Sequence, residues 1–118
     1  MPTKDHGEWA EQLALEYLQD RGLSLRERNV RSRGGEIDLV MQEGETVVFV
    51  EVRYRHDARF GGALPSVDGA KQQRLLRAAA AYLQRHWRSP PPCRIDVLAI
   101  EGAPREPAIE WIRNAIGA

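Results

Sequence analysis

Apolar residues recur at helical spacing in two stretches of the chain. The first covers residues 7–20 and is followed by Gly22, a residue type that commonly ends helices. The second covers residues 67–86, with Ser66 as the expected N-cap. The stripe positions are Ala10, Leu13, Ala14, Tyr17 and Leu18 in the first stretch, and Leu75, Leu76, Ala79, Tyr82 and Leu83 in the second. We therefore predict two amphipathic helices.

Between and after these helices the apolar positions alternate as they do in β-strands. The runs predicted as strands cover residues 23–30, 36–42, 45–55 and 93–100, and residues 109–116 form a short last element, either strand or helix. The order is α-β-β-β-α-β within a single domain of residues 1–118. This order favours an α/β sandwich in which a mixed central sheet is flanked by helices.

The second and third predicted strands are separated by a short turn that contains glycine, which is typical of a β-hairpin. With a two-residue turn at Glu43-Gly44, Asp38 and Glu51 are diagonal neighbours, and with a four-residue turn they lie directly opposite each other. Side chains alternate along a strand, so both turns place the two acids on one face. That face carries Glu36, Asp38, Glu51 and Arg53, and the other carries Ile37, Leu39, Met41, Val48, Val50, Val52 and Tyr54, a typical core set.

Three acids on one face of a hairpin repel one another, which costs stability unless positive charge lies between them. A cation such as Mg²⁺ would meet this need, because hard cations prefer oxygen ligands and can activate water beside a phosphodiester. Glu11, at the border of the first helical stripe, could lean towards this face. Gln72, inside the second stripe near its start, could reach into the site, and Lys71 lies on the flank of that stripe. An exposed acidic face paired with arginines, beside solvated helix ends, fits the same pattern.

Composition narrows the classes of protein. The 118 residues are 42% hydrophobic and 29% charged, with a net charge of zero. The chain has no apolar run that could span a bilayer, no apolar leader at its start and a single cysteine, so we expect a cytoplasmic protein without disulfides or a membrane partner. Zero net charge is unusual for a nucleic-acid-binding protein, whose affinity comes largely from phosphate contacts. The arginines are nevertheless grouped, in residues 21–33 and 53–59, and Asp96 is expected to pair with an arginine nearby.

The hairpin sequence resembles the signature of a known family. Residues 35–40 (GEIDLV) and 48–55 (VFVEVRYR) are similar to the motif of the YraN-like family of predicted endonucleases, distant relatives of archaeal Holliday junction resolvases. Weaker similarity extends to residues 7–18, to Lys71-Gln72 and to residues 94–97. The resemblance implies a restriction-endonuclease-like fold and a site of the PD-(D/E)xK pattern.

In that implied pattern, Asp38 takes the first acid position and Glu51 the second, and Glu11 is the helix acid that completes the metal site. Glu36 belongs to the motif, and its role is less defined. Arg53 stands where the pattern has lysine. Arginine supplies charge and a two-pronged hydrogen-bonding fork for phosphate, but it does not deprotonate and is not a compact point charge.

Two functions follow from this sequence. One is a metal-dependent endonuclease that hydrolyses DNA phosphodiesters, in branched or repair intermediates, with Mg²⁺ or Mn²⁺ as cofactor and a homodimer as one expected state. The residues expected to guide the nucleic acid are Arg33, Arg55, Arg59, Lys71 and Gln72. The other is a catalytically weak or inactive nucleic-acid-binding or protein-interaction module that kept the nuclease fold. The zero net charge and Arg53 favour this alternative.

Overall fold

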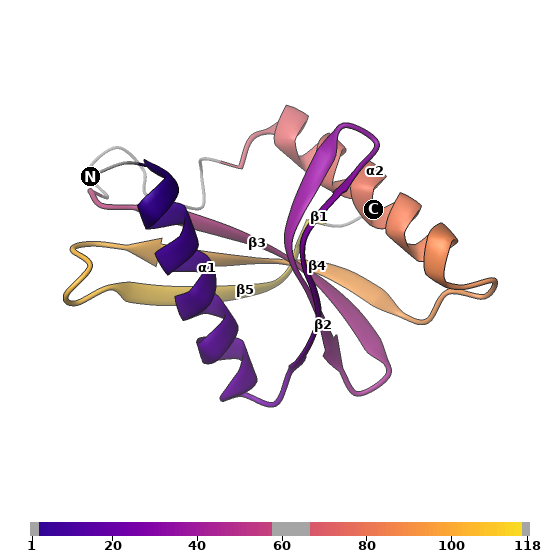
Figure 1. The fold of residues 1–118 in the computed structure, drawn as a ribbon, viewed down its shortest axis with the longest axis horizontal. Coiled ribbons are helices and arrows are strands. Elements are labelled where there is room, and N and C mark those ends of the chain that lie inside the picture. The colour runs from indigo at the N-terminus through magenta and orange to yellow at the C-terminus, as the bar shows by residue number, and fades with distance from the viewer. Residues whose placement is uncertain (1–2, 58–66, 117–118) are drawn as a thin grey trace.

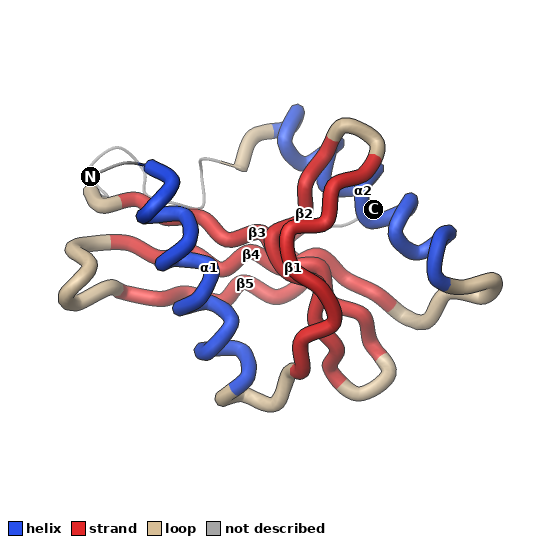
Figure 2. The backbone as a smooth tube through the Cα atoms, viewed as in Figure 1, coloured by secondary structure: helices blue, strands red, loops and turns tan. Residues whose placement is uncertain are grey.

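The computed structural model describes residues 3–57 and 67–116, which form a twisted five-stranded sheet and two helices (Figures 1 and 2). The elements in chain order are α1 (Thr3–Gln19), β1 (Ser24–Ser32), β2 (Gly35–Glu43), β3 (Thr46–Arg55), α2 (Gly69–His86), β4 (Cys93–Glu101) and β5 (Ala108–Ile116). The strands lie in the order β1-β2-β3-β4-β5, and all neighbours are antiparallel except β3 and β4. Helix α2 belongs to the crossover that a parallel pair requires. The predicted α/β class with a mixed sheet and flanking helices is confirmed.

Each helix covers one face of the sheet, so the central strands are buried on both sides (Figure 1). Helix α1 packs on a cluster that includes Leu39 and Val50, and helix α2 packs on a cluster that includes Phe49 and Val97. Alternate residues of β3 therefore enter different clusters, which explains the near-continuous apolar run of that strand. No helix in the described part of the chain is long and apolar enough to cross a membrane.

The starts of both helices differ from the prediction. Helix α1 begins at Thr3, four residues earlier than expected. The last element, for which strand and helix were both open, is the strand β5. Helix α2 begins at Gly69, and its N-cap is Asp68 rather than Ser66, which lies outside the described residues. The Asp68 carboxylate accepts a hydrogen bond of 2.9 Å from the backbone N–H of Lys71, which satisfies one of the free donors of the first helical turn.

The β2–β3 hairpin turns at Gly44-Glu45, one residue later than the two-residue turn considered first, because Glu43 pairs with Thr46. The pairing differs from that prediction by two residues, so each side chain keeps its face. The described pairing ends at Leu39–Val50, and beyond it β2 follows β1 away from β3. This divergence corrects one expectation. Ile37, predicted to share a face with Leu39, packs instead in the α2 cluster.

The tip of the β1–β2 hairpin presses on α2 (Figure 1). Its turn is Arg33-Gly34, with φ values of +53° and +76°, the backbone conformation that two-residue hairpins favour. The next residue, Gly35, lies so close to α2 that a Cβ atom there would stand 2.5 Å from the carbonyl oxygen of Arg74. Any larger residue would push the hairpin off the helix, so glycine fixes how closely the two elements pack.

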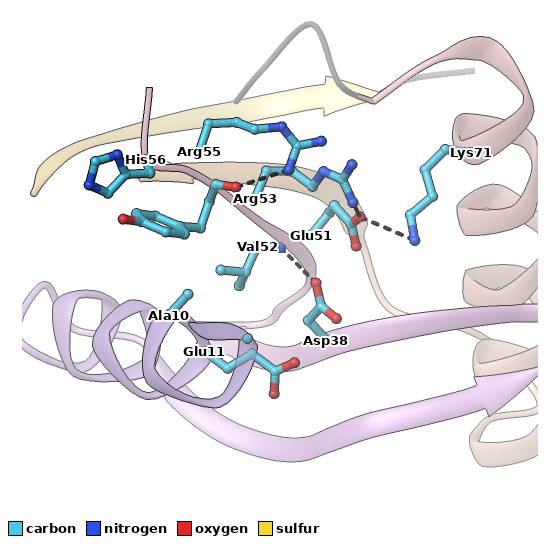
Figure 3. Close-up of a pocket in the computed structure, with 11 residues that line it drawn as sticks. Ala10, Glu11, Asp38, Glu51, Val52, Arg53, Arg55, His56 and Lys71 are labelled. Carbon is cyan, nitrogen blue, oxygen red and sulfur yellow. Dashed lines mark hydrogen bonds and ion pairs between the residues drawn. The ribbon is translucent and has the colours of Figure 1, made fainter. Parts of the chain in front are cut away.

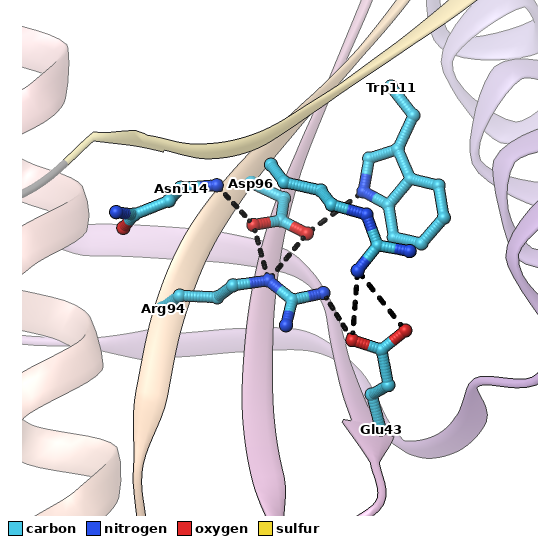
Figure 4. Close-up of polar contacts among 6 residues, drawn as sticks. Glu43, Arg94, Asp96, Trp111 and Asn114 are labelled. Carbon is cyan, nitrogen blue, oxygen red and sulfur yellow. Dashed lines mark hydrogen bonds and ion pairs between the residues drawn. The ribbon is translucent and has the colours of Figure 1, made fainter.

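A buried acid, Asp96 on β4, links β4 to the edge strand β5 (Figure 4). Its carboxylate accepts hydrogen bonds from the side chains of Arg94 at 3.0 Å and Trp111 at 2.9 Å, and from the backbone N–H of Asn114 at 2.8 Å. The predicted pairing with an arginine is confirmed. The hydrogen bond from Trp111 on β5 to Asp96 fastens β5 to β4.

Candidate active site

A pocket that collects three acidic side chains lies where β2 and β3 diverge, between the two helices (Figure 3). The pocket has a volume of about 400 Å³. Its lining residues are Gly7, Ala10, Glu11, Asp38, Glu51, Val52, Arg53, Tyr54, Arg55, His56 and Lys71. One acid comes from α1, one from β2 and one from β3, so the fold gathers carboxylates that are up to forty positions apart in the chain.

Asp38 closes the gap that opens between the two strands. Its Oδ2 atom accepts a hydrogen bond of 2.8 Å from the backbone N–H of Val52, beyond the last pair of the β2–β3 ladder. The Asp38 carboxylate is thereby held beside Glu51 rather than turned to solvent (Figure 3). This is the close approach of two acids that the hairpin pattern predicted.

Glu51 is 1% exposed, which is unusual for a carboxylate. Burial raises its pKa to about 8, and the neighbouring charge of Asp38 acts in the same direction. The ammonium of Lys71 opposes this rise without cancelling it. Two like charges in a dry site cannot both ionise freely, so the pair holds a proton at pH values where isolated carboxyls have lost theirs.

Two cations approach the same oxygen of Glu51. Lys71 Nζ lies 3.2 Å and Arg53 Nη1 lies 3.5 Å from Glu51 Oε2. The other oxygen, Oε1, is fully buried and has no hydrogen-bond partner among the described residues. A buried carboxylate oxygen without a donor is costly, and natural structures seldom keep one without a functional reason.

Glu11 reaches the pocket from α1 (Figure 3). Its pKa is raised to about 7, chiefly by burial and then by the charge of Asp38, while Arg28 and a hydrogen bond from Asn29 partly offset the rise. With its side-chain nitrogen turned towards Glu11, the Asn29 amide donates to Oε1 at 3.1 Å, an orientation assigned from the hydrogen-bond partners. Asn29 has φ of +53°, a left-handed conformation that asparagine tolerates better than most residues.

The donor set fits a hard divalent cation in its chemistry. Asp38 and Glu51 offer carboxylate oxygens side by side, and one of them lacks any partner. Within residues 3–57 and 67–116, no group of three or more Asp, Glu, His or Cys side chains is drawn together closely enough to hold an ion. Glu11 lines the pocket but does not complete such a group. Two carboxylates are nevertheless the usual protein contribution to a Mg²⁺ site, where water and substrate phosphate supply the other ligands.

The remaining predicted site residues lie at different distances from this pocket. Arg55 lines it, whereas Glu36 lines the neighbouring hollow and forms a 3.9 Å ion pair with Arg31. Gln72 donates its side-chain amide to the Val67 carbonyl at the start of α2 and does not line the pocket. The other two predictions fall elsewhere: Arg33 is at the tip of the β1–β2 hairpin, and Arg59 lies outside the described residues.

Sequence reasoning assigned Lys71 to nucleic-acid binding and did not place it on Glu51. Its position on the flank of the helical stripe, in the first turn of α2, is the signal that could have placed it at the site. Asn29 was missed altogether, because nothing in its strand pattern distinguishes it from a solvent-facing residue. His56 and Tyr54 also line the pocket without having been singled out.

Comparison with known proteins gives consistent matches over nearly the whole chain. The family model described as "Uncharacterised protein family UPF0102" matches residues 10–100. A UPF0102 protein from Pseudomonas putida strain F1 is 54% identical over 117 residues, covering 97% of this chain and 94% of the relative. Another from Stutzerimonas stutzeri strain A1501 is 54% identical over 114 residues, covering 96% and 95%. A third, from Janthinobacterium sp. strain Marseille, is 53% identical over 112 residues, covering 95% and 87%.

Proposed function

The chain belongs to the uncharacterised protein family UPF0102, and from this premise and its acidic pocket we propose that it is a metal-dependent nuclease with a restriction-endonuclease-like fold. One observation carries the proposal: the buried carboxylate of Glu51 lies beside Asp38 and has an oxygen without a donor. A purely structural acid would be neutralised by its surroundings. This one is kept in an unfavourable state, as functional acids commonly are.

Asp38 and Glu51 would hold Mg²⁺ or Mn²⁺. When bound there, such an ion supplies positive charge next to a phosphodiester and lowers the pKa of a coordinated water. The protein contributes a fixed pair of oxygens, since Asp38 is anchored by the Val52 N–H and Glu51 is held within the sheet. Glu11 stands on the opposite wall of the same pocket and adds negative charge that a cation would relieve.

Lys71 supplies the lysine ammonium that is missing from the third position of the PD-(D/E)xK pattern. That position is Arg53, whose planar fork suits two parallel hydrogen bonds to phosphate oxygens. The compact ammonium of Lys71 lies 3.2 Å from the second acid of the pattern, although it comes from α2 rather than from β3. We therefore assign phosphate binding to Arg53, and to Lys71 the point charge beside the reacting group.

The substrate we propose is DNA, in branched or repair intermediates, which rests on the resemblance of the hairpin motif rather than on the pocket. A single acidic centre cuts one strand at a time. Cleavage of both strands of a duplex would therefore need two copies of the chain, so we include a homodimer on DNA in the proposal.

The proposal is tested by incubating the purified chain with Mn²⁺ and a labelled four-way DNA junction, and separating the products on a denaturing gel. We expect nicking by the parent, none by Glu51→Ala, and unchanged nicking by Glu45→Ala, which removes an exposed acid from the hairpin turn. Equal cleavage by the parent and Glu51→Ala would assign the activity to another site or a contaminant. DNA binding that persists in EDTA, without cleavage in Mn²⁺, would favour the non-catalytic interaction module.

The assignment of the two cations has its own test. If Lys71 supplies the point charge, Lys71→Gln should lower the cleavage rate by about a hundredfold or more, the usual loss for one transition-state donor. Arg53→Lys should retain most of the rate, and Lys71→Gln combined with Arg53→Lys should recover part of the loss. A Lys71→Gln variant that cleaves like the parent would remove Lys71 from the mechanism and leave the acids in place.

A further inference from the structure

Four hollows on the surface form a continuous row that starts at the acidic pocket and follows α2. Each shares a lining residue with the next: Lys71 belongs to the acidic pocket and to the second hollow, Ser32 to the second and third, and Arg85 to the third and fourth. The row passes under the tip of the β1–β2 hairpin, which crosses α2 near Arg74 (Figure 1). It reaches Arg88, just past the end of the helix.

The charge of this row changes sign along its length. The acidic pocket holds three carboxylates, whereas the three further hollows together hold one, that of Glu36. Their cationic lining, which we call the basic track, consists of Arg31, Arg33, Lys71, Arg74, Arg85 and Arg88. Within the described ranges, no carboxylate pairs with Arg33, Arg74, Arg85 or Arg88, and the one pair on the track, Arg31 with Glu36, is long at 3.9 Å. A zero net charge therefore conceals a strong local separation of charge.

The helix sets the direction of the track. Lys71, Arg74 and Arg85 are separated by 3 and 11 residues, which is close to whole numbers of helical turns. They consequently lie along one side of α2, and Arg88 follows in the extended chain beyond the C-cap Trp87. The gap between Arg74 and Arg85 is where the hairpin tip crosses, and the tip itself brings Arg31 and Arg33. Two separate elements thus complete one row of positive charge.

Building on the nuclease function proposed above, we propose that the basic track binds the phosphate backbone of a double-stranded DNA arm that leads away from the acidic pocket. From Lys71 to Arg85 the helix rises about 21 Å, at 1.5 Å per residue. One strand of a duplex places a phosphate about every 3.4 Å along the axis, so the track spans about six phosphates. Free arginines spaced along such a line suit a linear polyanion far better than a small anion.

The track favours duplex over single-stranded DNA. Single-strand sites combine cations with aromatic side chains on which bases stack. The two aromatic rings at the end of the track are already engaged: the guanidinium of Arg26 lies 4.6 Å from the ring centroid of the half-buried Trp87, and the His86 ring stacks on Tyr82 with a centroid distance of 4.0 Å. The described part of the track therefore offers charge for a backbone rather than a platform for bases.

The experiment is fluorescence anisotropy of a labelled 20-base-pair duplex, with the full chain in EDTA, between 50 and 200 mM salt. The double variant Arg74→Gln with Arg85→Gln should weaken binding at least about tenfold at low salt. It should also reduce the slope of log K against log salt by about 2, since each lost phosphate contact contributes about 0.9. A matched double variant, Arg21→Gln with Arg105→Gln, removes the same charge from exposed positions off the track and should keep the parent slope.

Equal losses of duplex affinity and salt slope in the two double variants would overturn the proposed binding site, because the effect would then follow net charge alone. The single variant Arg31→Gln tests the hairpin contribution separately and should reduce the slope by about 1. Tighter binding of a single strand, or of heparin at equal charge, would overturn the assignment to duplex DNA. These measurements are made without a divalent cation, so they separate the two proposals: a track that binds duplex in a chain that never cleaves would reject the nuclease and keep the track.

Discussion

Two carboxylates are buried in the same sheet and are treated in opposite ways by their surroundings. Asp96 is fully buried on β4, and each of its oxygens receives hydrogen bonds from two donors (Figure 4). Glu51 is 1% exposed on the neighbouring strand β3 (Figure 3). Both cations that contact it approach Oε2, Oε1 has no donor among the described residues, and another acid lies beside it.

The difference distinguishes a structural acid from a functional one. Burying a charge is costly, and a protein recovers that cost only when partners satisfy the charge fully. Asp96 meets that condition and fastens β5 to β4. Glu51 does not meet it, so its presence weakens the fold, and its persistence requires a role that a neutral residue would not fill.

The largest effect is expected at Asp96. Asp96→Ala removes the acceptor that Arg94, the Trp111 side chain and the Asn114 N–H share, and leaves Arg94 paired with Glu43 alone, so we expect the free energy of unfolding to fall by about 3–5 kcal/mol. Urea denaturation followed by circular dichroism measures the change. Asp20→Ala, which removes an exposed acid after α1, is the matched control and should change stability by less than about 0.5 kcal/mol. A small loss of stability in Asp96→Ala would mean that its hydrogen bonds contribute little to the fold, and Asp96 would then not differ from Glu51 as a structural acid.

Substitution of Glu51 is expected to raise the free energy of unfolding rather than lower it. In EDTA at pH 8, Glu51→Gln removes charge from a site that raises the pKa of the carboxyl, so we expect the variant to be more stable than the parent by about 1–2 kcal/mol. The same denaturation experiment measures it, and the same variant should fail to cleave DNA. A destabilised Glu51→Gln would show that the Lys71 and Arg53 pairings outweigh the burial and the repulsion.

The stability of the fold should also depend on pH through the raised pKa values of the pocket acids. Folding raises the pKa of Glu11 to about 7 and of Glu51 to about 8, against 4.5 for the unperturbed carboxyl, so the folded state binds more protons than the unfolded state between these values. The stability that these two groups contribute is therefore greatest below about pH 4.5 and is lost as the pH rises from there through 7 and 8, by about 1 kcal/mol or more from Glu51 alone. Thermal melts in EDTA from pH 5 to 8 measure this trend. Glu51→Gln should flatten it, and an equally steep decline in that variant would assign the trend to other groups.

The smallest effect is expected at the edge of the Asp96 network. Arg113 pairs with Glu43 at 3.0 Å but its side chain is 51% exposed, so Arg113→Gln should cost less than about 1 kcal/mol. Arg94 pairs with the same glutamate from a more buried position and remains in place. A loss as large as that of Asp96→Ala would show that the network is cooperative out to its exposed end.

The sequence predicted most of the fold because helical and strand periodicities directly reflect which faces are buried. Thus the two helices, the positions of the strands along the chain and the shared face of Asp38 and Glu51 follow from local pattern. The α2 start was missed because Asp68 and Ser66 are both good N-caps, and only the local hydrogen bond to Lys71 distinguishes them. The place of Ile37 was missed because it depends on where β2 leaves β3, a tertiary feature.

The candidate site was predictable where residues share a hairpin and unpredictable where elements meet. Glu11 was named from its helical position and from the resemblance. The contact of Lys71 with Glu51 depends on how α2 is seated against the sheet, and Gly35 fixes that seating through its approach to Arg74. The basic track could not be predicted from the sequence for the same reason. Arg31 and Arg74 are distant in sequence, and only the packing of the hairpin tip on α2 brings them together.

The central claim, that Asp38 and Glu51 form a cation site, is tested most directly by calorimetric titration of Mn²⁺ into the DNA-free chain. We expect saturable binding of one ion to the parent at pH 7.5, accompanied by proton release, because the acids hold a proton that the ion displaces. Asp38→Asn and Glu51→Gln should each abolish this binding, and Glu45→Gln should preserve it. Identical heats from the parent and from Asp38→Asn would contradict the account.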